Sequence, residues 1–346
     1  MNYIQEQDIS LFVKYFELSD SLNNSRFLIT GATGLIGSTL VNCLLALDKN
    51  ICITCPVRDI KKVKTIFGDV QGTINFIECD DLLVFLQEIK SNMYFDYIIH
   101  CASPTNGKYI KEHPVETYDL AIDSTRALLR YSVRNGVKSM VYLSSLEYYG
   151  IHSDDNLIYE EMLGYVDFDD NRSSYPLGKR AAEYYCKCFA KEYGARVKIA
   201  RLTQTFGAGV TIEDPRVFAQ FARSILDKKN IVLHTSGDTS KPYCYTTDCV
   251  SAILYILLKG ENGVAYNVAN PDTYISIKDL ATFLCVSFQP QSKVIYEENS
   301  EMGYAPITKL NLSIDKLKKL GWKPNVGLME MFDRLIKSFK YERDRQ

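Results

Sequence analysis

Neither sign of charge predominates in this chain, and no apolar run in it is long enough to suggest a membrane span. The 346 residues include 40 Lys and Arg against 42 Asp and Glu, which leaves a net charge of −2. This balance argues against a dedicated surface for nucleic acid or for an anionic membrane. The N-terminal stretch MNYIQEQDISLFVKYFELSD lacks the basic segment and apolar core of a signal peptide. We therefore expect a soluble, cytoplasmic protein.

Residues that commonly bind metals are few or poorly arranged. The four histidines are scattered along the chain. Among the ten cysteines, Cys52 and Cys55 form a CxxC, but it lies in an alternating apolar strand, and no second CxxC or histidine pair follows. We interpret the cysteines as small buried hydrophobic residues in a reducing compartment, and we expect no metal site.

The chain does contain a regular alternation of short β-rich runs and helical patterns. The β-rich runs lie at 26–30, 51–57, 74–78, 97–101, 139–144 and 197–202. Helical stretches between them include 36–47, 114–135 and 176–193. Near-continuous apolar strands separated by helices predict a parallel sheet covered on both faces. The predicted fold class is therefore doubly wound α/β.

The alternation weakens after about residue 205, which indicates a smaller, interleaved C-terminal lobe. We expect an N-terminal helical extension at 1–24 and a dinucleotide-binding domain at 25–205 plus about 242–270. A substrate-binding lobe would take up about 206–241 plus 271–346.

The strongest local signal is RFLITGATGLIGSTLVNCLLAL, in which a strand leads through three glycines into a helix. Such glycines allow a tight turn and let the backbone approach a pyrophosphate at the helix N-terminus. The pattern predicts a dinucleotide site. Its contacts would come from Gly31, Thr33, Gly34, Leu35, Ile36 and Gly37.

The choice between NAD and NADP depends on the end of the second strand, ICITCPVRD. A carboxylate there binds the ribose hydroxyls of NAD, whereas an arginine can pair with the extra phosphate of NADP. Arg58 precedes Asp59, so the sequence leans toward NADP and leaves NAD open. Asp80, after the third strand, is placed to meet the adenine side of the cofactor.

A second signal is SSYPLGKRAAEYYC, in which Tyr175 and Lys179 lie four residues apart on one helix face. A tyrosine with an ordinary pKa is a poor base at neutral pH, and a neighbouring ammonium lowers that pKa by stabilising the phenolate. The pair can then move the proton of a hydroxyl that is being oxidised. The glycine-rich turn and the strand ending in Ser144 and Ser145 make the combination specific.

With these motifs the chain resembles the extended short-chain dehydrogenase/reductases of the NAD-dependent epimerase/dehydratase family, which modify nucleotide sugars. The resemblance runs from about Ser25 onward through TGATGLIG, HCASP, SSLEYYG, YPLGK, RLTQTFGAG, RVFAQF and LGWKP. It implies a Rossmann-type fold and a catalytic hydroxyl five residues before the glycine that ends the strand motif. Counting back from Gly150 gives Ser145 rather than Ser144.

The resemblance implies a role for each catalytic residue. Tyr175 would take the proton of the sugar 4-hydroxyl as hydride leaves C4, Lys179 would hold the cofactor ribose, and Ser145 would hydrogen-bond the reacting oxygen. The cofactor would end the cycle as it began. Further cofactor contacts would be Asp80, Asp81, Cys101, Ala102 and Ser103, with Tyr175 and Lys179.

It also implies substrate contacts from Ser103, Ser145, Gln204, Arg216 and Lys241. Arg216 is a candidate phosphate contact. Lys241 stands where many relatives have an arginine, which keeps the charge but loses the bidentate fork, and a solvated loop lysine fits equally well. Gln204 replaces an asparagine that often faces the substrate.

Glu147, two residues after Ser145, bears on the fate of the transient 4-keto sugar. A plain 4-epimerase needs no extra base, whereas dehydratases of this family use a glutamate here to abstract the C5 proton, and UDP-glucuronate decarboxylases carry one too. Leu146 stands where one dehydratase subgroup has an aspartate and where the other enzymes have serine. Glu147 thus favours dehydration or decarboxylation without choosing between them, and a structural carboxylate is the alternative.

Two other classes of function share some of these residues. An NADPH-dependent carbonyl reductase of the same fold would have the glycine-rich turn, Arg58, Tyr175 and Lys179, but not the nucleotide-sugar features of the second lobe. A noncatalytic dinucleotide sensor would tolerate loss of the Ser-Tyr-Lys set. We therefore expect an enzyme that uses NAD or NADP and acts on a nucleotide-diphosphate sugar. Relatives commonly dimerise through their long helices, so we expect a homodimer.

Overall fold

A parallel seven-stranded sheet lies at the centre of the computed structural model, which describes residues 1–68, 74–89, 93–297 and 306–345. The strand order is β11-β7-β5-β4-β1-β2-β3, and every neighbouring pair is parallel. The strands are β1 (Arg26–Thr30), β2 (Cys52–Val57), β3 (Ile74–Glu78), β4 (Tyr97–His100), β5 (Ser139–Ser145), β7 (Val197–Leu202) and β11 (Ala265–Val268). The predicted doubly wound α/β fold is confirmed.

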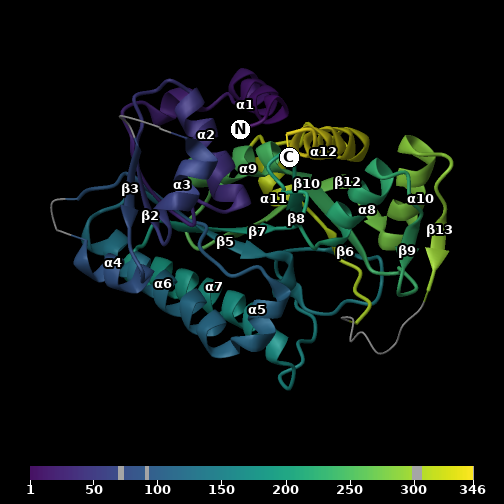
Figure 1. Cartoon of the computed structure of the whole chain (residues 1–346). Coiled ribbons are helices and arrows are strands. Elements are labelled where there is room, and N and C mark those ends of the chain that lie inside the picture. Colours follow the sequence, from purple (N-terminus) through teal and green to yellow (C-terminus); the bar gives the residue numbers. More distant parts are fainter. Residues whose placement is uncertain (69–73, 90–92, 298–305, 346) are drawn as a thin grey trace.

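Helices cover both faces of this sheet (Figure 1). One face carries α2 (Leu35–Ala46), α3 (Ile60–Phe67) and α9 (Thr246–Lys259), and the other carries α4 (Leu82–Glu88), α6 (Pro114–Arg134) and α7 (Ser174–Tyr193). Successive strand residues point to opposite faces, so Phe27 and Ile29 pack with the first set and Leu28 with the second. This two-sided burial explains why the strands are apolar at nearly every position.

The N-terminal helix α1 (Tyr3–Tyr15) packs against α2, α9 and α12 (Leu328–Arg343). Asn2 and Gln5 form a capping box at its start. The buried carboxylate of Asp8 accepts a hydrogen bond of 2.6 Å from the Tyr245 hydroxyl and pairs with Arg334 of α12. A short 3-10 helix, η1 (Ser19–Leu22), then leads into β1.

A second group of elements lies at the carboxyl-end side of the sheet (Figure 1). Its strands β8 (Gln204–Phe206), β10 (Ser240–Tyr245) and β12 (Asn270–Ser276) form a three-stranded sheet. Helices α8 (Val217–Leu226), α10 (Ile277–Phe288) and α12 share its core, in which the Phe206 ring lies 4.5 Å from that of Phe218 and 4.9 Å from that of Phe332, between centroids. The remaining elements are β6 (Leu157–Ile158), β9 (Ile231–Leu233), β13 (Val294–Tyr296), β14 (Asn311–Leu312), α5 (Gly107–Glu112), α11 (Asp315–Lys319), η2 (Leu146–Tyr149) and η3 (Asn171–Ser173).

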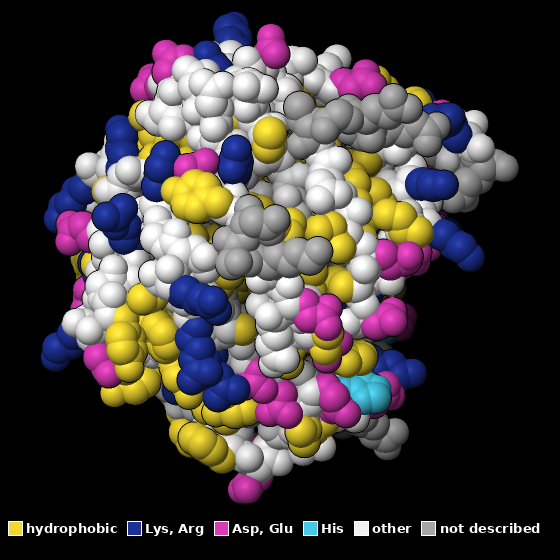
Figure 2. All heavy atoms as spheres, turned by 90° about the vertical axis from the view of Figure 1, so that its left-hand side faces the viewer, with side chains coloured by type: hydrophobic (Ala, Val, Ile, Leu, Met, Phe, Trp, Pro, Cys, Tyr) yellow, Lys and Arg dark blue, Asp and Glu magenta, His cyan; other side chains and the backbone are white. Residues whose placement is uncertain are grey.

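The structure can be compared with the expectations for surface charge, membrane spans and cysteine burial. Basic and acidic side chains both occur across the face drawn in Figure 2. Within the described ranges, none of the helices has the length and apolar character needed to span a bilayer. Six of the ten cysteines, Cys43, Cys55, Cys186, Cys244, Cys249 and Cys285, are buried free thiols, as predicted. Cys79, Cys101 and Cys188 are half-buried and Cys52 is exposed, so the prediction was wrong for these four.

Candidate active site

The carboxyl ends of β1, β4 and β5 meet at one edge of the sheet, because neighbouring strands run parallel. Strand order reverses direction between β1 and β4, and ligands of open α/β sheets bind in the crevice at such a point. The glycine-rich turn follows β1, the HCASP segment follows β4, and Ser145 ends β5.

The turn after β1 is so tight that two of its glycines leave no room for a side chain. Gly31 has a φ of +70°, and a Cβ there would lie 2.7 Å from the Ala102 backbone nitrogen. A Cβ on Gly37 would lie 2.2 Å from the Gly31 carbonyl oxygen. Helix α2 begins directly after Gly34, so its first backbone N–H groups face the turn. The residues present fit a dinucleotide pyrophosphate at this helix N-terminus.

A buried histidine holds the segment after β4 in place. His100 Nδ1 lies 2.7 Å from Thr30 Oγ1, and its Nε2 lies 2.9 Å from Ser124 Oγ. The Ala102 backbone N–H donates to Thr30 Oγ1 at 3.3 Å. Burial lowers the pKa of His100 to about 3, so its ring is neutral. No role for His100 was predicted from the sequence. The available signal was its place at the start of the quoted segment HCASP, directly before Cys101.

Ser145, Tyr175 and Lys179 converge beside this edge. Tyr175 lies in the first turn of α7, and its hydroxyl faces the hydroxyls of Ser145 and Ser103. The Lys179 ammonium lies 5.6 Å from the centroid of the Tyr175 ring and donates to the Leu143 carbonyl at 2.8 Å. Ser145 Oγ accepts the Glu147 backbone N–H at 3.2 Å, which fixes the turn that follows β5. The predicted catalytic residues Ser145, Tyr175 and Lys179 therefore lie together with Ser103, which was predicted to contact cofactor and substrate.

The pKa of Tyr175 shifts in the direction opposite to the one expected from the Tyr-Lys spacing. Burial and the Glu147 carboxylate raise this pKa, and hydrogen bonds from Ser145 and Ser103 and the charge of Arg172 oppose the rise. Burial also lowers the pKa of Lys179 to about 8, although the Glu183 carboxylate raises it in part. Tyr175 is thus a neutral phenol in the ligand-free protein.

Glu147 is held by Arg172, a residue to which no role was assigned from the sequence. The Arg172 guanidinium donates through both terminal nitrogens to the two Glu147 oxygens, at 2.8 and 2.9 Å. Each side chain is 33% exposed, so the pair is open to a ligand. The available signal was the place of Arg172 directly before the quoted segment SSYPLGKRAAEYYC, three residues before Tyr175.

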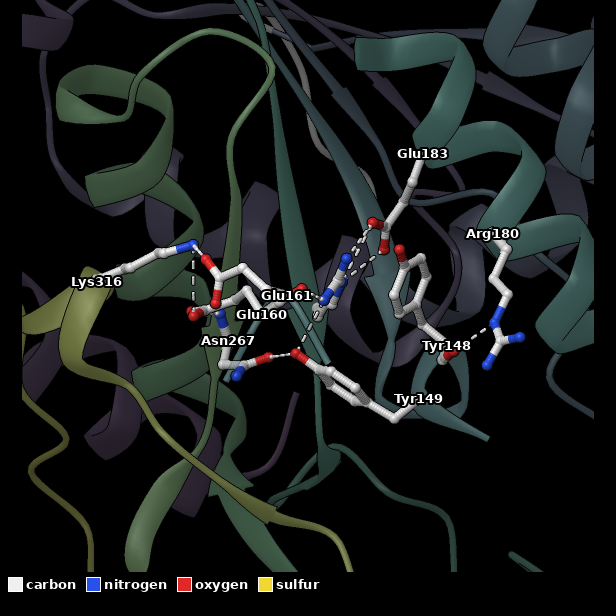
Figure 3. A network of polar contacts seen from close by, with 9 residues as sticks. Tyr148, Tyr149, Glu160, Glu161, Arg180, Glu183, Asn267 and Lys316 are labelled. Carbon is white, nitrogen blue, oxygen red and sulfur yellow. Dashed lines mark hydrogen bonds and ion pairs between the residues drawn. The ribbon is translucent and has the colours of Figure 1, made fainter. Parts of the chain in front are cut away.

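A buried polar network connects α7, the helix that carries Tyr175 and Lys179, to β7 and η2. Arg201 of β7 and Glu183 of α7 form an ion pair with exposed fractions of 0% and 1%. The Arg201 guanidinium carbon lies 3.5 Å from the centroid of the Tyr148 ring, and its Nη1 donates to the Tyr149 hydroxyl at 2.9 Å. Figure 3 shows Glu183 from α7 and the two tyrosines from η2 turned toward one another, with Asn267 accepting from Tyr149 at 2.6 Å. The turn that carries Glu147 is thereby joined to the Tyr-Lys helix.

The predicted adenine-side residues lie at the ends of β2 and β3. Asp59 caps α3, because its carboxylate accepts the backbone N–H groups of Lys61 and Lys62 at 2.8 and 3.2 Å. Asp81 caps α4 in the same way. Arg58 and Asp80 are exposed beside these caps.

Three of the five predicted substrate residues, Gln204, Arg216 and Lys241, lie on the second group of elements, whereas Ser103 and Ser145 lie beside Tyr175. Gln204 of β8 pairs in register with Tyr243 of β10, two residues after Lys241. Arg216 precedes α8, and its Nε donates to Asp214 at 2.9 Å. Burial lowers the pKa of Lys241, the Glu147 carboxylate opposes this shift, and the charges of Arg172 and Arg216 add to it, so Lys241 is within range of the charges of the Glu147–Arg172 pair.

A Rossmann-type sheet with Ser145, Tyr175 and Lys179 at its carboxyl edge is the arrangement predicted for an enzyme that uses a nicotinamide cofactor. The family model "NAD dependent epimerase/dehydratase family" matches residues 27–269, and the chain belongs to this family. The resemblance predicted from the motifs is confirmed.

Individual relatives include enzymes with different activities. UDP-glucuronic acid decarboxylase 4 of Arabidopsis thaliana is 27% identical over 316 residues, which cover 91% of this chain and 68% of that protein. UDP-glucose 4-epimerase from Thermotoga maritima, solved with UDP-glucose, has a TM-score of 0.77 at 22% identity, covering 92% of this chain and 99% of that one. dTDP-glucose 4,6-dehydratase from Bacillus anthracis, solved with NAD, has a TM-score of 0.76 at 17% identity, covering 92% and 98%. The similarity to these two structures shows that they have the same fold as this chain.

Proposed function

We propose that this enzyme acts on a nucleotide-diphosphate sugar through transient oxidation at C4 and restores its cofactor within each cycle. The observation that carries the proposal is the convergence of Ser145, Tyr175 and Lys179 beside the glycine-rich turn. These residues can hold a sugar hydroxyl, move its proton and orient a cofactor ribose in one place.

Each residue has a distinct part in this chemistry. Ser145 hydrogen-bonds the reacting oxygen, and Tyr175 exchanges its proton. Lys179, fixed by the Leu143 carbonyl, places positive charge beside the Tyr175 ring. An oxidised nicotinamide, when bound, supplies the hydride acceptor and further positive charge that opposes the raised Tyr175 pKa. Gly31, Gly34 and Gly37 would hold its pyrophosphate.

The substrate would bind between the catalytic edge and the second lobe, at about 206–241 plus 271–346. Lys241 and Arg216 would contact the diphosphate, and Gln204 would face the sugar. The relatives named UDP-glucuronic acid decarboxylase and UDP-glucose 4-epimerase make UDP the first nucleotide to try.

Glu147 would carry chemistry beyond C4. Once C4 is a ketone, the C5 hydrogen is acidic and a carboxyl group attached to C5 is readily lost. A carboxylate near Tyr175 can serve dehydration or assist decarboxylation, and a plain epimerisation needs neither. The position of Glu147, close enough to raise the Tyr175 pKa, supports this part.

The cofactor would be NADP if Arg58 pairs with the additional phosphate. Asp59 is engaged as a helix cap, which leaves Arg58 as the free charged group at the end of β2. We further propose a homodimer formed through α6 and α7, where Tyr118 and Tyr184 are 37% and 70% exposed. Light scattering on the purified chain tests the dimer.

The proposal is tested by incubating the protein and cofactor with UDP-, GDP-, CDP- and dTDP-sugars and following product mass. Loss of carbon dioxide identifies a decarboxylase, loss of water a dehydratase, and a new isomer of equal mass an epimerase. Reduction of a carbonyl compound without any of these products would overturn the proposal.

A further inference from the structure

The Glu147–Arg172 pair lies beside the position proposed for the sugar C4 hydroxyl. The Glu147 backbone N–H donates to Ser145 Oγ at 3.2 Å, and Arg172 lies in η3, which runs directly into the first turn of α7 with Tyr175. The charges of Glu147 and Arg172 accordingly both act on the pKa of Tyr175, the first raising it and the second lowering it. Arg172 is fixed at its backbone, because its N–H donates to the Asp170 carboxylate at 2.9 Å at the start of η3. In a sugar ring, C5 and its substituent are the next atoms after C4. A substrate oriented by Tyr175 therefore brings its C5 substituent within reach of this pair.

Both oxygens of Glu147 are occupied in the ligand-free protein. Each accepts a charge-assisted hydrogen bond from Arg172, at 2.8 and 2.9 Å. Each oxygen keeps a free lone pair, but the two charge-assisted bonds lower the basicity of the carboxylate, so losing one of them makes Glu147 a better base toward a C–H proton. The pair is one-third exposed on each side, so a ligand can reach the guanidinium and replace one carboxylate with another.

The local charges favour an additional anion. Burial lowers the pKa of Lys241, and an added anion would oppose that shift as Glu147 already does. The charges of Arg172 and Arg216 also act on this pKa and lower it. Arg216 is already paired with Asp214, and Arg172 with Glu147. Across the described parts of the chain, Lys241 has no carboxylate within ion-pair distance. Lys241 is therefore a cation without an ion-pair partner among the described residues near Glu147 before the substrate arrives.

We infer that Arg172 is a specificity-determining residue: it selects sugars with a carboxylate at C5, and that carboxylate displaces Glu147 from the guanidinium. This inference rests on the proposed function. The exchange replaces one bidentate carboxylate with another, so the Arg172 charge stays paired throughout. A neutral hydroxymethyl group cannot replace a carboxylate there, and it would leave Glu147 bound. Substrate selection and release of Glu147 are thus one event.

The test compares equilibrium binding of two sugars that differ only at C5. UDP, GDP, CDP and dTDP are first titrated into the NAD-loaded Tyr175→Phe protein, in which turnover is blocked. The glucose and glucuronate derivatives of the tightest-binding nucleotide are then titrated by calorimetry. We expect the glucuronate derivative to bind at least about tenfold more tightly, the effect of one or two hydrogen bonds to a charged group.

Variants of Arg172 in the same background assign this preference. In Arg172→Met the ratio should fall to about one, while affinity for the free nucleotide stays within about twofold. Arg172→Lys keeps the charge without the fork and should give an intermediate ratio. Lys187→Met, which removes an exposed charge from α7, should leave the ratio unchanged. If Arg172→Met does not bind NAD because it has not folded, the ratio measured for Arg172→Lys is used to test the inference.

The outcomes separate the two proposals. Equal binding of both sugars by the parent protein, or an unchanged preference in the Arg172 variants, overturns the inference and leaves the proposed function standing. Failure to bind any nucleotide or sugar derivative overturns both.

Discussion

Arg201 and Glu183 form an ion pair that is closed off from solvent on every side, with exposed fractions of 0% and 1%. Glu183 follows Lys179 by one helical turn on α7, and Arg201 contacts both tyrosines that follow Glu147. One pair thus joins the Tyr-Lys helix, strand β7 and the turn after β5. Its charges also reach Lys179, because the Glu183 carboxylate raises the pKa of that ammonium.

Replacing Glu183 with glutamine should shift the alkaline limb of the pH profile downward. Lys179 acts as a cation, so activity should hold below its pKa of about 8 and fall as the pH rises through that value. Without the Glu183 charge the Lys179 pKa falls further, and activity is lost at lower pH. The profile of kcat/KM against pH measures this limb. Glu192→Gln, an exposed change on the same helix, should leave it in place, and an unmoved limb in Glu183→Gln would contradict the link.

Replacing Tyr175 with phenylalanine should remove the proton transfer and leave the fold intact. We expect kcat to fall by about 10²–10⁴, the usual contribution of a positioned acid or base. Steady-state product formation measures the loss, and titration with NAD shows whether the cofactor still binds. The matched control is Tyr193→Phe, since Tyr193 is the last residue of the same helix and is 55% exposed. Full activity in Tyr175→Phe would refute its assigned role.

Replacing Glu147 with glutamine separates oxidation at C4 from the later chemistry at C5. Tyr175 should still allow oxidation, so reduced nicotinamide should accumulate after mixing while product formation slows by about 10²–10⁴. Stopped-flow absorbance and product mass follow the two events. Glu112→Gln, on the surface of α5, is the control. Turnover at the parent rate would show that Glu147 has a structural role only.

Replacing Arg58 with alanine tests the choice of cofactor. A lost arginine–phosphate contact should weaken NADP binding by about tenfold or more, and NAD binding should change little. Titration of each cofactor into the parent and variant measures both constants. Lys64→Ala removes a nearby exposed charge on α3 and should preserve the ratio. If NAD and NADP weaken equally, Arg58 does not discriminate between them.

Replacing Gly37 with alanine should disrupt the cofactor turn. The new Cβ would lie 2.2 Å from the Gly31 carbonyl oxygen, and backbone atoms cannot move away cheaply. Overpacking of this kind costs about 1–3 kcal/mol. Thermal unfolding and NAD titration should both show the loss. Gly107→Ala, where nothing lies within 4 Å of an added Cβ, should leave both unchanged, and an unaltered Gly37→Ala protein would contradict the described turn.

Local patterns were sufficient to predict the sheet and the positions of the main site residues. Apolar runs marked the strands, because a parallel sheet buries both faces of each one. The strand order itself was not predicted; because the structure places β1, β4 and β5 side by side and parallel, their carboxyl ends meet at one edge. Helix spacing then fixed Tyr175 relative to Lys179.

The features that sequence reasoning missed depend on tertiary contacts. Arg172 reaches Glu147 across 25 positions of the chain, between two short helices whose relative placement no periodicity reveals. The Tyr175 pKa was expected to fall because Lys179 is close in sequence, but burial dominates and is set by the packed protein.

The central claim is that oxidation at C4 is reversed within each cycle, and cofactor stoichiometry tests it most directly. Product formed from the nucleotide sugar identified by the panel is measured together with the NADH or NADPH gained or lost. The account predicts many product molecules per enzyme with no net change in cofactor. One cofactor molecule consumed or produced for each product molecule would contradict it.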